Sequence, residues 1–390
     1  MRTLLVKHHV ASLCVFSVLI MGLAACGGGG SGSDAAGAGQ AVSPTNGGNG
    51  SASPTPTPSR DATRPGQVGT ETPGTTPGPT EEPTEPVDII LRPGANIRQA
   101  ARNAPDGATL ILSAGMYPPV ELRPGDLQGS LTILGDVTGE LTEGLTASVI
   151  ISAGTKDAAL SIVEQVDVTL DSLTLVGGNE AALLVTDSEG LTILNCILRG
   201  SHGDGARFER SVSGLFFNNL IYNNAGTGIR VLGTDDWFII NNTVYSSKDH
   251  GLYAGISLST PSSNLFITNN IFNKNIPSGI TVDNVPPSSL DGYFADFNLN
   301  SDGYGLDTPL GEGDVNGPGS ASDPQFTFPA GGNFRTTATS PAVNGGDFDT
   351  DPDLALFLSD RSIQNDGTLD SVPVDLGYHY LVPATPTPRP

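Results

Sequence analysis

The chain has 390 residues, in which 41 acidic side chains outnumber 18 basic ones and give a formal net charge of −23. A chain this acidic is not expected to bind nucleic acid or anionic lipid headgroups, because both carry charge of the same sign. Its length suffices for one large domain, and its three cysteines are too few for a fold held together by several disulfides.

Residues 1–25 have the pattern of a bacterial secretion signal. Arg2 and Lys7 give a basic start, and the apolar segment from Leu13 to Leu23 is too short to span a bilayer. Its end, Leu23-Ala-Ala-Cys26, resembles the lipobox of bacterial lipoproteins. The resemblance implies that Cys26 is lipidated and becomes the mature N-terminus. An ordinary signal peptide cut near the same alanines is the alternative.

Two segments lack the apolar side chains that folding needs. Residues 26–87 are rich in Gly and Ser and then in Pro and Thr, and residues 383–390 have the second composition. Such segments cannot bury enough apolar surface to offset the entropy of folding. The sequence therefore predicts a disordered tether at 26–87, which would hold the folded part away from a membrane, and a disordered tail at 383–390.

An amphipathic helix is expected near the start of the folded part. Within Ile97-Arg-Gln-Ala-Ala-Arg-Asn-Ala-Pro-Asp-Gly107, apolar side chains recur at helical spacing on one face. These are Ile97, Ala100, Ala101 and Ala104. One apolar face on a short helix is suited to covering the open end of a β structure.

A motif of alternating residues recurs along the middle of the chain. The segments LDSLTL, ILNCIL, FFNNLI, IINNTV, ITNNIF and FADFNL align in one polar column with spacings of 23, 23, 23, 28 and 27 residues: Ser172, Asn195, Asn218, Asn241, Asn269 and Asp296. Small residues form a second column ten positions further on: Ala182, Gly205, Gly228, Gly251 and Gly279. Because one such unit cannot bury its own apolar face, the repeat predicts a stacked solenoid.

Stacking assigns a role to each column. Like residues of successive coils lie about 4.8 Å apart, so the polar column is expected to form a ladder of side-chain amides along a turn. The small residues fit a bend with positive φ or a close approach of two backbones. Apolar residues beside the turn would point inward: Leu170, Ile193, Phe216, Ile239, Ile267 and Phe294.

The repeat resembles the right-handed parallel β-helix of pectate-lyase-like proteins and of bacterial parallel β-helix repeat proteins. The ITNN and INNT turns and the Gly-Ile-x-Val strands carry the resemblance. It implies an all-β, single-stranded right-handed parallel β-helix over residues 88–320, capped by the N-terminal helix. It also implies a small irregular closure at 321–382. This fold hosts many activities, so the resemblance does not define the chemistry.

A candidate binding surface lies on the strand that follows each small residue. Side chains just before the small residue and two positions after it are expected to point outward on consecutive coils. They are Asp204, Arg207, Arg230, His250 and Tyr253. Arginine forks bind carboxylates and tyrosine stacks on sugar rings, so this surface predicts binding of a polysaccharide, in particular an acidic one. The alternative is a solvated face on which Arg207 pairs with Glu209 or Asp204.

The two long repeats bear on the same surface. Their extra residues are expected after the same strand, in Ser257–Asn264 and Asn284–Gly292. Insertions on one side of a solenoid often build a binding wall. Both insertions would then stand beside the predicted surface.

Four aspartates alternate in the sequence GGDFDTDPDL: Asp347, Asp349, Asp351 and Asp353. They would converge on a calcium ion if the loop folds back, whereas on a straight strand they would share one face and repel. The surrounding SPAVNGGD and DLGY segments resemble the C-terminal closure of many bacterial β-helix proteins. In that alternative the carboxylates cap loops over the last coil. Calcium is the cofactor expected.

Three functions remain open at this stage. The preferred one is a lipid-anchored protein that binds extracellular or cell-wall polysaccharide on a solenoid face. The alternatives are a polysaccharide lyase, which in the resembled family uses calcium and an Arg or Lys base on uronates, and a structural or adhesive envelope protein without ligand chemistry. The lone Cys196 of the folded part is expected to be a small packed residue. We expect a monomer in the bacterial cell envelope, at the outer membrane or cell surface.

Overall fold

The computed structural model describes residues 87–246, 256–260, 262–282, 292–303, 305, 311, 313–317 and 319–382. The predicted signal and tail and the predicted tether up to residue 86 lie outside these residues, and so do Cys26, His250, Gly251 and Tyr253. In the described part of the chain, no helix has both the length and the apolar character needed to cross a bilayer.

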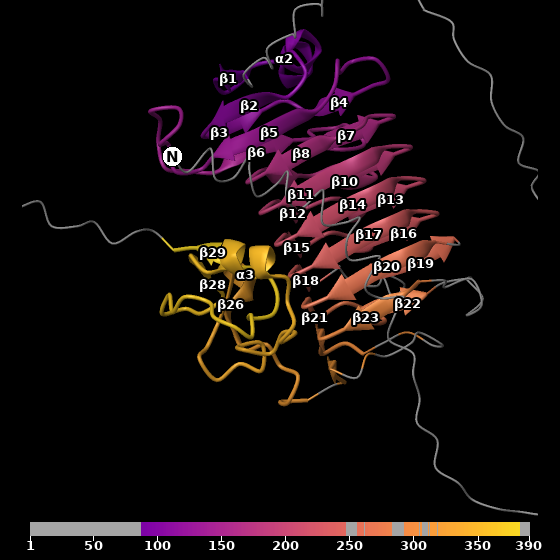
Figure 1. Ribbon diagram of the computed structural model, residues 1–390, viewed down its shortest axis with the longest axis vertical. Coiled ribbons are helices and arrows are strands. Elements are labelled where there is room, and N and C mark those ends of the chain that lie inside the picture. The colour runs from indigo at the N-terminus through magenta and orange to yellow at the C-terminus, as the bar shows by residue number, and fades with distance from the viewer. Residues whose placement is uncertain are drawn as a thin grey trace, which may run out of the picture. The chain divides into compact units, whose positions relative to one another are not determined.

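Stacked coils form the fold, and each complete coil adds one strand to each of three parallel sheets, here called A, B and C (Figure 1). Sheet A consists of β1 (Asp88–Leu91), β2 (Ala108–Ser113), β5 (Leu131–Asp136), β8 (Val168–Asp171), β11 (Glu189–Leu194), β14 (Val212–Phe217), β17 (Asp235–Ile240), β20 (Ser263–Thr268) and β23 (Phe294–Asp296). Sheet B consists of β3 (Gly115–Tyr117), β6 (Val149–Ser152), β9 (Thr174–Val176), β12 (Ile197–Arg199), β15 (Leu220–Tyr222), β18 (Thr243–Tyr245), β21 (Ile271–Asn273), β24 (Leu299–Asn300) and β25 (Val315–Asn316). Sheet C consists of β4 (Val120–Leu122), β7 (Leu160–Val163), β10 (Ala181–Thr186), β13 (Asp204–Glu209), β16 (Ile229–Leu232), β19 (Ile256–Thr260) and β22 (Ile280–Val282). The predicted all-β parallel β-helix is confirmed.

Inward-facing side chains form continuous columns along the stack. The column predicted beside the turn is fully buried in its first five members: Leu170, Ile193, Phe216, Ile239 and Ile267. Burying one such side chain contributes about 1.5–3 kcal/mol before entropy is counted. Alternation along each strand therefore gives every coil an apolar interior that only the neighbouring coils can cover.

In each repeat, the turn between sheets A and B places one residue in the left-handed region. This outer column has φ values of 58, 54, 53, 54 and 58° at Ser172, Asn195, Asn218, Asn241 and Asn269. Asparagine tolerates this region because its short amide bonds locally. The predicted ladder is present where Asn218 Nδ2 donates to Asn195 Oδ1 and Asn195 Nδ2 donates to Asp171 Oδ1, both at 2.8 Å. The outer column thus has two roles: its residues allow the backbone to turn, and their side chains form hydrogen bonds along the stack.

The next residue of each turn points inward and forms a second ladder. It runs through Cys196, Asn219, Asn242, Asn270 and Asn298, and each backbone N–H donates to the amide oxygen of the next member at 2.8–3.1 Å. Cys196 begins this ladder as a buried small residue, as predicted, and burial raises the pKa of its thiol. The ladder satisfies polar backbone groups that the apolar interior cannot.

The small-residue column serves close approach and not positive φ. Gly205, at the start of β13, is absent from the left-handed region, but a Cβ there would lie 2.4 Å from Ile221 Cγ2 and 2.6 Å from Gly228 O. At Gly279 a Cβ would meet Asn300 Oδ1 at 2.0 Å. The coil therefore narrows at this corner, and glycine leaves the room that the next coil occupies.

The alignment predicted for the last repeat is wrong by one residue. Thr268 pairs with Asp296, so Phe297, with φ of 53°, follows Asn269 in the outer column, where Asp296 was expected. For the same reason Ala295 occupies the buried position next to Ile267, and Phe294 is exposed. The repeat here is 28 residues long and not 27.

The predicted N-terminal cap is confirmed. Helix α2 (Ile97–Asn103) begins at Asn96, whose side chain accepts a hydrogen bond from Gln99 N. Ile97, Ala101 and Ala104 are buried, and the helix packs against β2 and β4 at the end of the stack (Figure 1). The cap covers apolar interior that would otherwise face water at the first coil.

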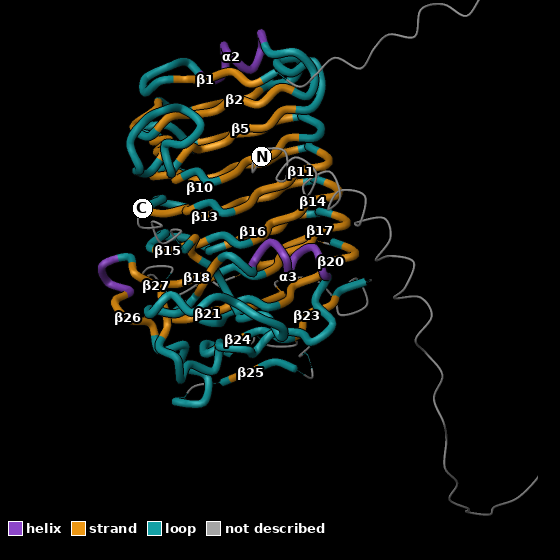
Figure 2. Tube along the Cα trace, turned by 60° about the vertical axis from the view of Figure 1, so that its left-hand side comes forward, coloured by secondary structure: helices purple, strands orange, loops and turns teal. Residues whose placement is uncertain are grey.

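The closure runs back along the outside of the coils. It comprises β26 (Phe326–Phe328), η3 (Pro329–Gly331), β27 (Asn333–Thr336), α3 (Pro352–Leu358), β28 (Arg361–Ser362) and β29 (Tyr380–Leu381). Helix α3 lies over strands of sheet A (Figure 2), and its Leu354 and Leu358 form one buried cluster with Leu194, Phe217 and Phe238 of that sheet. The closure therefore covers several coils and not only the last one.

Candidate functional site

The outer face of sheet C carries the predicted arginine pair. Arg207 of β13 and Arg230 of β16 are direct partners on adjacent strands, between Leu184 on one side and Ser257 on the other. Thr281 continues the column on β22. The prediction that Arg207 and Arg230 lie together on consecutive coils is thus met by the strand register.

Tyr253 was placed in this column by the sequence, and that placement is wrong. Ser257 pairs with Arg230, 27 residues further along the chain, so four residues beyond the 23-residue repeat precede β19. In the next repeat Ser257 pairs with Thr281 and Phe266 with Phe294, which puts most of the extra residues after β22. The two insertions therefore enter at opposite ends of the sheet C strands. Tyr253 and His250 themselves lie outside the described residues.

Arg230 is held by a buried carboxylate. Its Nε and Nη2 donate to Asp204 Oδ2 and Oδ1 at 2.7 and 3.2 Å, and Nη2 also donates to Thr227 Oγ1 at 2.8 Å. Asp204 is only 5% exposed and accepts a further bond from Thr227 N at 2.8 Å. This forked pair fixes the guanidinium against the coil, so Arg230 has a structural task of its own.

Arg207 is more loosely held. Its Nε donates to Glu209 Oε1 at 2.6 Å, and 31% of its side chain is exposed. Within the described residues, its two terminal nitrogens have no hydrogen-bond partner. The alternative interpretation, in which Arg207 pairs with Glu209, is confirmed for Nε. The terminal fork remains available to an external acceptor.

Charges around the pair balance locally. Arg210 extends the cluster with bonds to Asp187 at 2.7 and 2.8 Å and to Glu209 at 3.4 Å. Its hydrogen bond holds the pKa of Asp187 below the ordinary value. Three arginines thus face three carboxylates: Arg207, Arg210 and Arg230 against Asp187, Asp204 and Glu209. The face presents directed donors but no net positive field.

The alternating aspartates form local turns and a helix cap. Asp351 is the N-cap of α3 and accepts bonds from Asp353 N and Leu354 N at 2.8 and 3.3 Å. Asp347 Oδ1 accepts from Asp349 N at 2.9 Å, and Asp347 N donates to Asn269 Oδ1 at 3.0 Å. These contacts agree with the alternative interpretation, in which the carboxylates cap loops of the closure. Calcium binding by this run stays a prediction.

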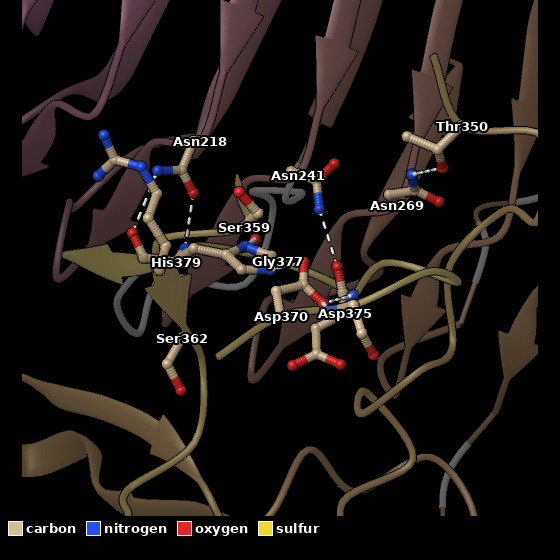
Figure 3. Close-up of polar contacts among 12 residues, drawn as sticks. Asn218, Asn241, Asn269, Thr350, Ser359, Ser362, Asp370, Asp375, Gly377 and His379 are labelled. Atoms are coloured by element: carbon tan, nitrogen blue, oxygen red, sulfur yellow. Dashed lines mark hydrogen bonds and ion pairs between the residues drawn. The ribbon is translucent and has the colours of Figure 1, made fainter. Parts of the chain in front are cut away.

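A cluster that the sequence analysis missed lies inside the closure. Ligand atoms of Asp370, Asp375 and His379 all lie within 4.8 Å of one another (Figure 3). Asp375 belongs to the D-x-G-x-x-Y-like end of the closure, which was noticed only as a fold signature. Asp370 and His379 had no pattern to mark them, because their spacing follows no strand or helix period.

Backbone contacts tie this cluster to the outer asparagine column. Asn218 Oδ1 accepts from His379 N at 2.6 Å, and Asn218 Nδ2 donates to His379 O at 3.1 Å. Asn241 Nδ2 donates to Asp375 O at 2.9 Å. Figure 3 shows both amides pointing toward the closure. The outer column thereby holds the closing segment.

Comparison with known families gives the hand of the solenoid. Residues 158–298 match the family described as "Right handed beta helix region". Together with the three parallel sheets, this makes the fold a right-handed parallel β-helix. The predicted resemblance is confirmed at the level of the fold.

Similar solved structures are distant. The periplasmic alginate epimerase AlgG shares 16% sequence identity, with 59% of this chain and 67% of that chain covered and a TM-score of 0.30. Variants of that enzyme with one and two substitutions give identities of 15% and 12%, with TM-scores of 0.29 and 0.26; 59% and 60% of this chain and 67% and 73% of those chains are covered. No curated protein shows significant sequence similarity to this chain. At these values the likeness says nothing about activity.

Proposed function

We propose that this chain is a bacterial cell-envelope protein that binds an acidic polysaccharide on the outer face of sheet C. The observation that carries the proposal is the terminal fork of Arg207, which faces outward and has no partner among the described residues. A guanidinium fork matches the planar carboxylate of a uronate through two parallel hydrogen bonds. Glu209 holds Nε, so the fork is oriented before the ligand arrives.

The strand stacking supports a polymer as the ligand. Arg207 and Arg230 lie on adjacent strands of one parallel sheet, about 4.8 Å apart, whereas Ser257 on the next strand is buried. A linear chain of sugars lying along the stack would contact two successive rungs, one at Arg207 and one at Arg230. Segments 247–255 and 283–291 join the sheet C strands to their neighbours at opposite ends, and the first carries His250 and Tyr253. We include both side chains in the proposed binding surface.

Lyase chemistry is the second candidate and has less support. Calcium would have to be held by carboxylates beside the arginine face. The carboxylates described there, Asp187, Asp204 and Glu209, are engaged by Arg207, Arg210 and Arg230. In the described part of the chain, the side chains that could group around a metal ion lie in the closure instead. Binding without bond cleavage is therefore the preferred function.

The decisive experiment compares the wild type with Arg207→Gln. Binding of the purified chain to polyuronate oligosaccharides and to a neutral glucan is measured by calorimetry. We expect Arg207→Gln to weaken polyuronate binding by roughly tenfold, which corresponds to about 1.4 kcal/mol, and to leave folding unchanged. Tyr253→Ala should weaken binding by a similar factor.

Arg199→Gln is the matched control, because Arg199 lies on β12 of sheet B, away from the proposed surface. It should bind as the wild type does. Equal affinities of Arg207→Gln and the wild type would contradict the proposed surface. Absence of binding to every acidic polysaccharide offered would favour a structural envelope role. Release of unsaturated uronates in the same samples would favour the lyase.

We also propose that Cys26 anchors the protein to the membrane through lipid, because Leu23-Ala-Ala-Cys26 has the lipobox pattern. Cys26→Ser should move the protein from the membrane fraction to the soluble fraction, or leave it unprocessed. Ser17→Ala in the same signal is the control and should change neither. Normal processing and membrane retention of Cys26→Ser would contradict the anchor.

A further inference from the structure

Three ionisable side chains meet inside the closure, away from water. The side chains of His379 and Asp370 are 0% and 1% exposed, and Asp375 is 2% exposed. His379 Nε2 lies 2.9 Å from Asp370 Oδ2. A buried group of two carboxylates and one imidazole needs compensating charge, because burying unpaired charge costs several kcal/mol.

One carboxylate oxygen of this group has no protein partner. Asp375 Oδ1 accepts a bond from Asn344 N at 2.7 Å, but Oδ2 is buried and makes no hydrogen bond. Asp370 differs, because its Oδ1 accepts from Ser371 N and Asp375 N at 2.8 and 2.9 Å. Buried polar atoms are rarely left without a partner, so Asp375 Oδ2 calls for a ligand or a proton.

The other ring nitrogen of His379 defines its tautomer. Nδ1 lies 2.8 Å from Gly377 O, and a carbonyl oxygen only accepts, so Nδ1 carries a hydrogen. In a neutral ring Nε2 then carries no hydrogen, and its lone pair points at the carboxylate oxygen Oδ2 of Asp370. That contact is repulsive unless a cation or a proton lies between the two atoms. A histidine that donates one N–H to a backbone carbonyl and offers the other nitrogen is the usual arrangement of a metal ligand.

The distances fit a small divalent ion in octahedral coordination. Two ligand atoms at about 2.1 Å from such an ion, at the octahedral angle of about 90°, are separated by roughly 3.0 Å. The Nε2–Oδ2 separation of 2.9 Å is close to that value, and all three ligand atoms lie within 4.8 Å of one another. One imidazole and two carboxylates suit zinc or manganese among divalent ions.

We propose that Asp370, Asp375 and His379 bind one divalent transition-metal ion, which locks the closure onto the coils. The ion would use His379 Nε2, Asp370 Oδ2 and Asp375 Oδ2. Its two positive charges balance the two carboxylates, so the group becomes neutral with a neutral imidazole.

The position of the site gives it a task. His379 and Asp375 are the residues whose backbone groups bond to Asn218 and Asn241 of the outer column. Asp370 lies on the preceding loop, so an ion would join that loop to the segment that contacts the coils (Figure 3). Metal binding should therefore stabilise the closure against the β-helix. This inference does not depend on polysaccharide binding.

The test uses the full chain, stripped with a chelator at pH 7.5 and dialysed. Zinc, manganese or calcium chloride is then added separately, and bound metal is measured by equilibrium dialysis with atomic emission. We expect one zinc or manganese ion per chain and a rise of the thermal midpoint with metal concentration. His379→Gln and Asp375→Asn should each weaken binding by at least about tenfold.

Asp375→Asn also gives a readout that a purely structural role would not move. It keeps the oxygen that accepts from Asn344 N and removes one buried negative charge. Without metal it should be at least as stable as the wild type, whereas with zinc the wild type should be the more stable of the two. This crossover also shows that the variant folds.

Asp349→Asn, in the exposed part of the aspartate run, is the matched control and should bind zinc as the wild type does. The proposal is overturned if the stripped wild type binds neither zinc nor manganese. It is equally overturned if binding survives both ligand substitutions or is lost in Asp349→Asn. A metal-independent advantage of Asp375→Asn would assign the cluster to a protonated ion pair.

Discussion

Asparagine at the A–B turn satisfies two demands that few side chains satisfy together. In the outer column it adopts the left-handed region, and in the inner column its amide bonds in both directions along the stack. Glycine would meet the first demand but leave the ladder empty. Leucine would fill the inner position but leave polar backbone groups without partners. The double asparagine at 218–219, 241–242 and 269–270 therefore follows from the geometry of the corner.

Asn242 tests the inner ladder. It is fully buried; its Nδ2 donates to Phe216 O, Ile240 O and Asn270 Oδ1 at 2.8, 3.0 and 3.0 Å. Asn242→Leu should lower the free energy of unfolding by about 1–3 kcal/mol for each buried group left unpaired. Urea denaturation followed by circular dichroism measures the change. Asn103→Leu, at the exposed end of α2, should change stability by less than about 0.5 kcal/mol. Equal effects of the two substitutions would contradict the ladder.

Asp136 tests a carboxylate that organises a turn. It ends β5, and it accepts bonds from Gly139 N, Leu141 N and Thr142 N at 2.9, 3.0 and 2.8 Å. Burial alone would raise its pKa, but bonds from Thr142, Thr138 and Gly139 outweigh burial and hold the pKa below the ordinary 3.8. A lowered folded pKa means that the stabilisation is complete above the unfolded pKa and is lost as the pH falls through the folded one.

The expected result for Asp136→Asn follows from the direction of this pKa shift. At pH 7 the variant should be less stable by about 1–3 kcal/mol, and the difference should shrink below about pH 4. Urea unfolding between pH 3 and pH 7 measures it. Asp360→Asn, at an exposed site, is the control and should show little difference at any pH. A loss that is the same at pH 3 and pH 7 would contradict the carboxylate's role.

At the scale of elements, helix α3 shows how the closure attaches. Asp351 caps it, Pro352 occupies its first turn, and Leu354 and Leu358 face sheet A. Leu358→Ala removes a fully buried side chain and should destabilise this attachment by about 2–4 kcal/mol. Hydrogen exchange should rise in the closure and stay slow in β11, β14 and β17, because the coils have their own core.

The same helix supplies the control. Leu356 lies on its exposed side, so Leu356→Ala should leave exchange in the closure unchanged. If Leu358→Ala speeds exchange equally in the closure and in the coils, the closure and the β-helix unfold as one unit. That outcome would contradict an attachment that opens separately.

Much of the β-helix was predictable because stacking turns a local period into a long-range register. The 23-residue spacing placed the turns, the buried columns and Arg207 next to Arg230. The spacing gave a wrong register where a repeat contains an insertion. The sequence does not tell on which side of β19 the extra residues lie, so Tyr253 was assigned to the position that Ser257 occupies. In the last coil Asp296 was matched to the outer column, although Asn298 of the inner ladder was the better guide. The inner position is more constrained because it is surrounded on all sides.

The closure was less predictable for a physical reason. Asp370, Asp375 and His379 come together through loops held by contacts with Asn218, up to 161 residues away in sequence. Such contacts produce no regular spacing in the sequence from which they could be predicted. The capping pair Asp351-Pro352 followed by Leu354 and Leu358 was a readable helix signal, but the alternation of four aspartates favoured a different interpretation.

At the scale of the whole molecule, net charge and local charge oppose each other. The chain carries −23, so a polyuronate is repelled at long range, while the fork of Arg207 attracts one carboxylate at contact distance. Salt screens the long-range repulsion more strongly than the attraction at contact distance. The Debye length falls from about 30 Å at 0.01 M to about 8 Å at 0.15 M, which removes long-range repulsion but spares much of an attraction over about 3 Å.

The salt dependence of polyuronate binding is therefore expected to be opposite to that of a basic binding protein. Between 10 and 150 mM sodium chloride, the affinity of the wild type should rise by about twofold or more. Arg207→Gln should bind more weakly at each salt concentration and show the same rise, because the substitution does not remove the acidic surface. A neutral glucan should show no trend. Calorimetric titrations at four salt concentrations measure all three. A steep fall in polyuronate affinity with salt would mean that several cations contact the polymer, and the locally balanced face of sheet C would then be the wrong surface.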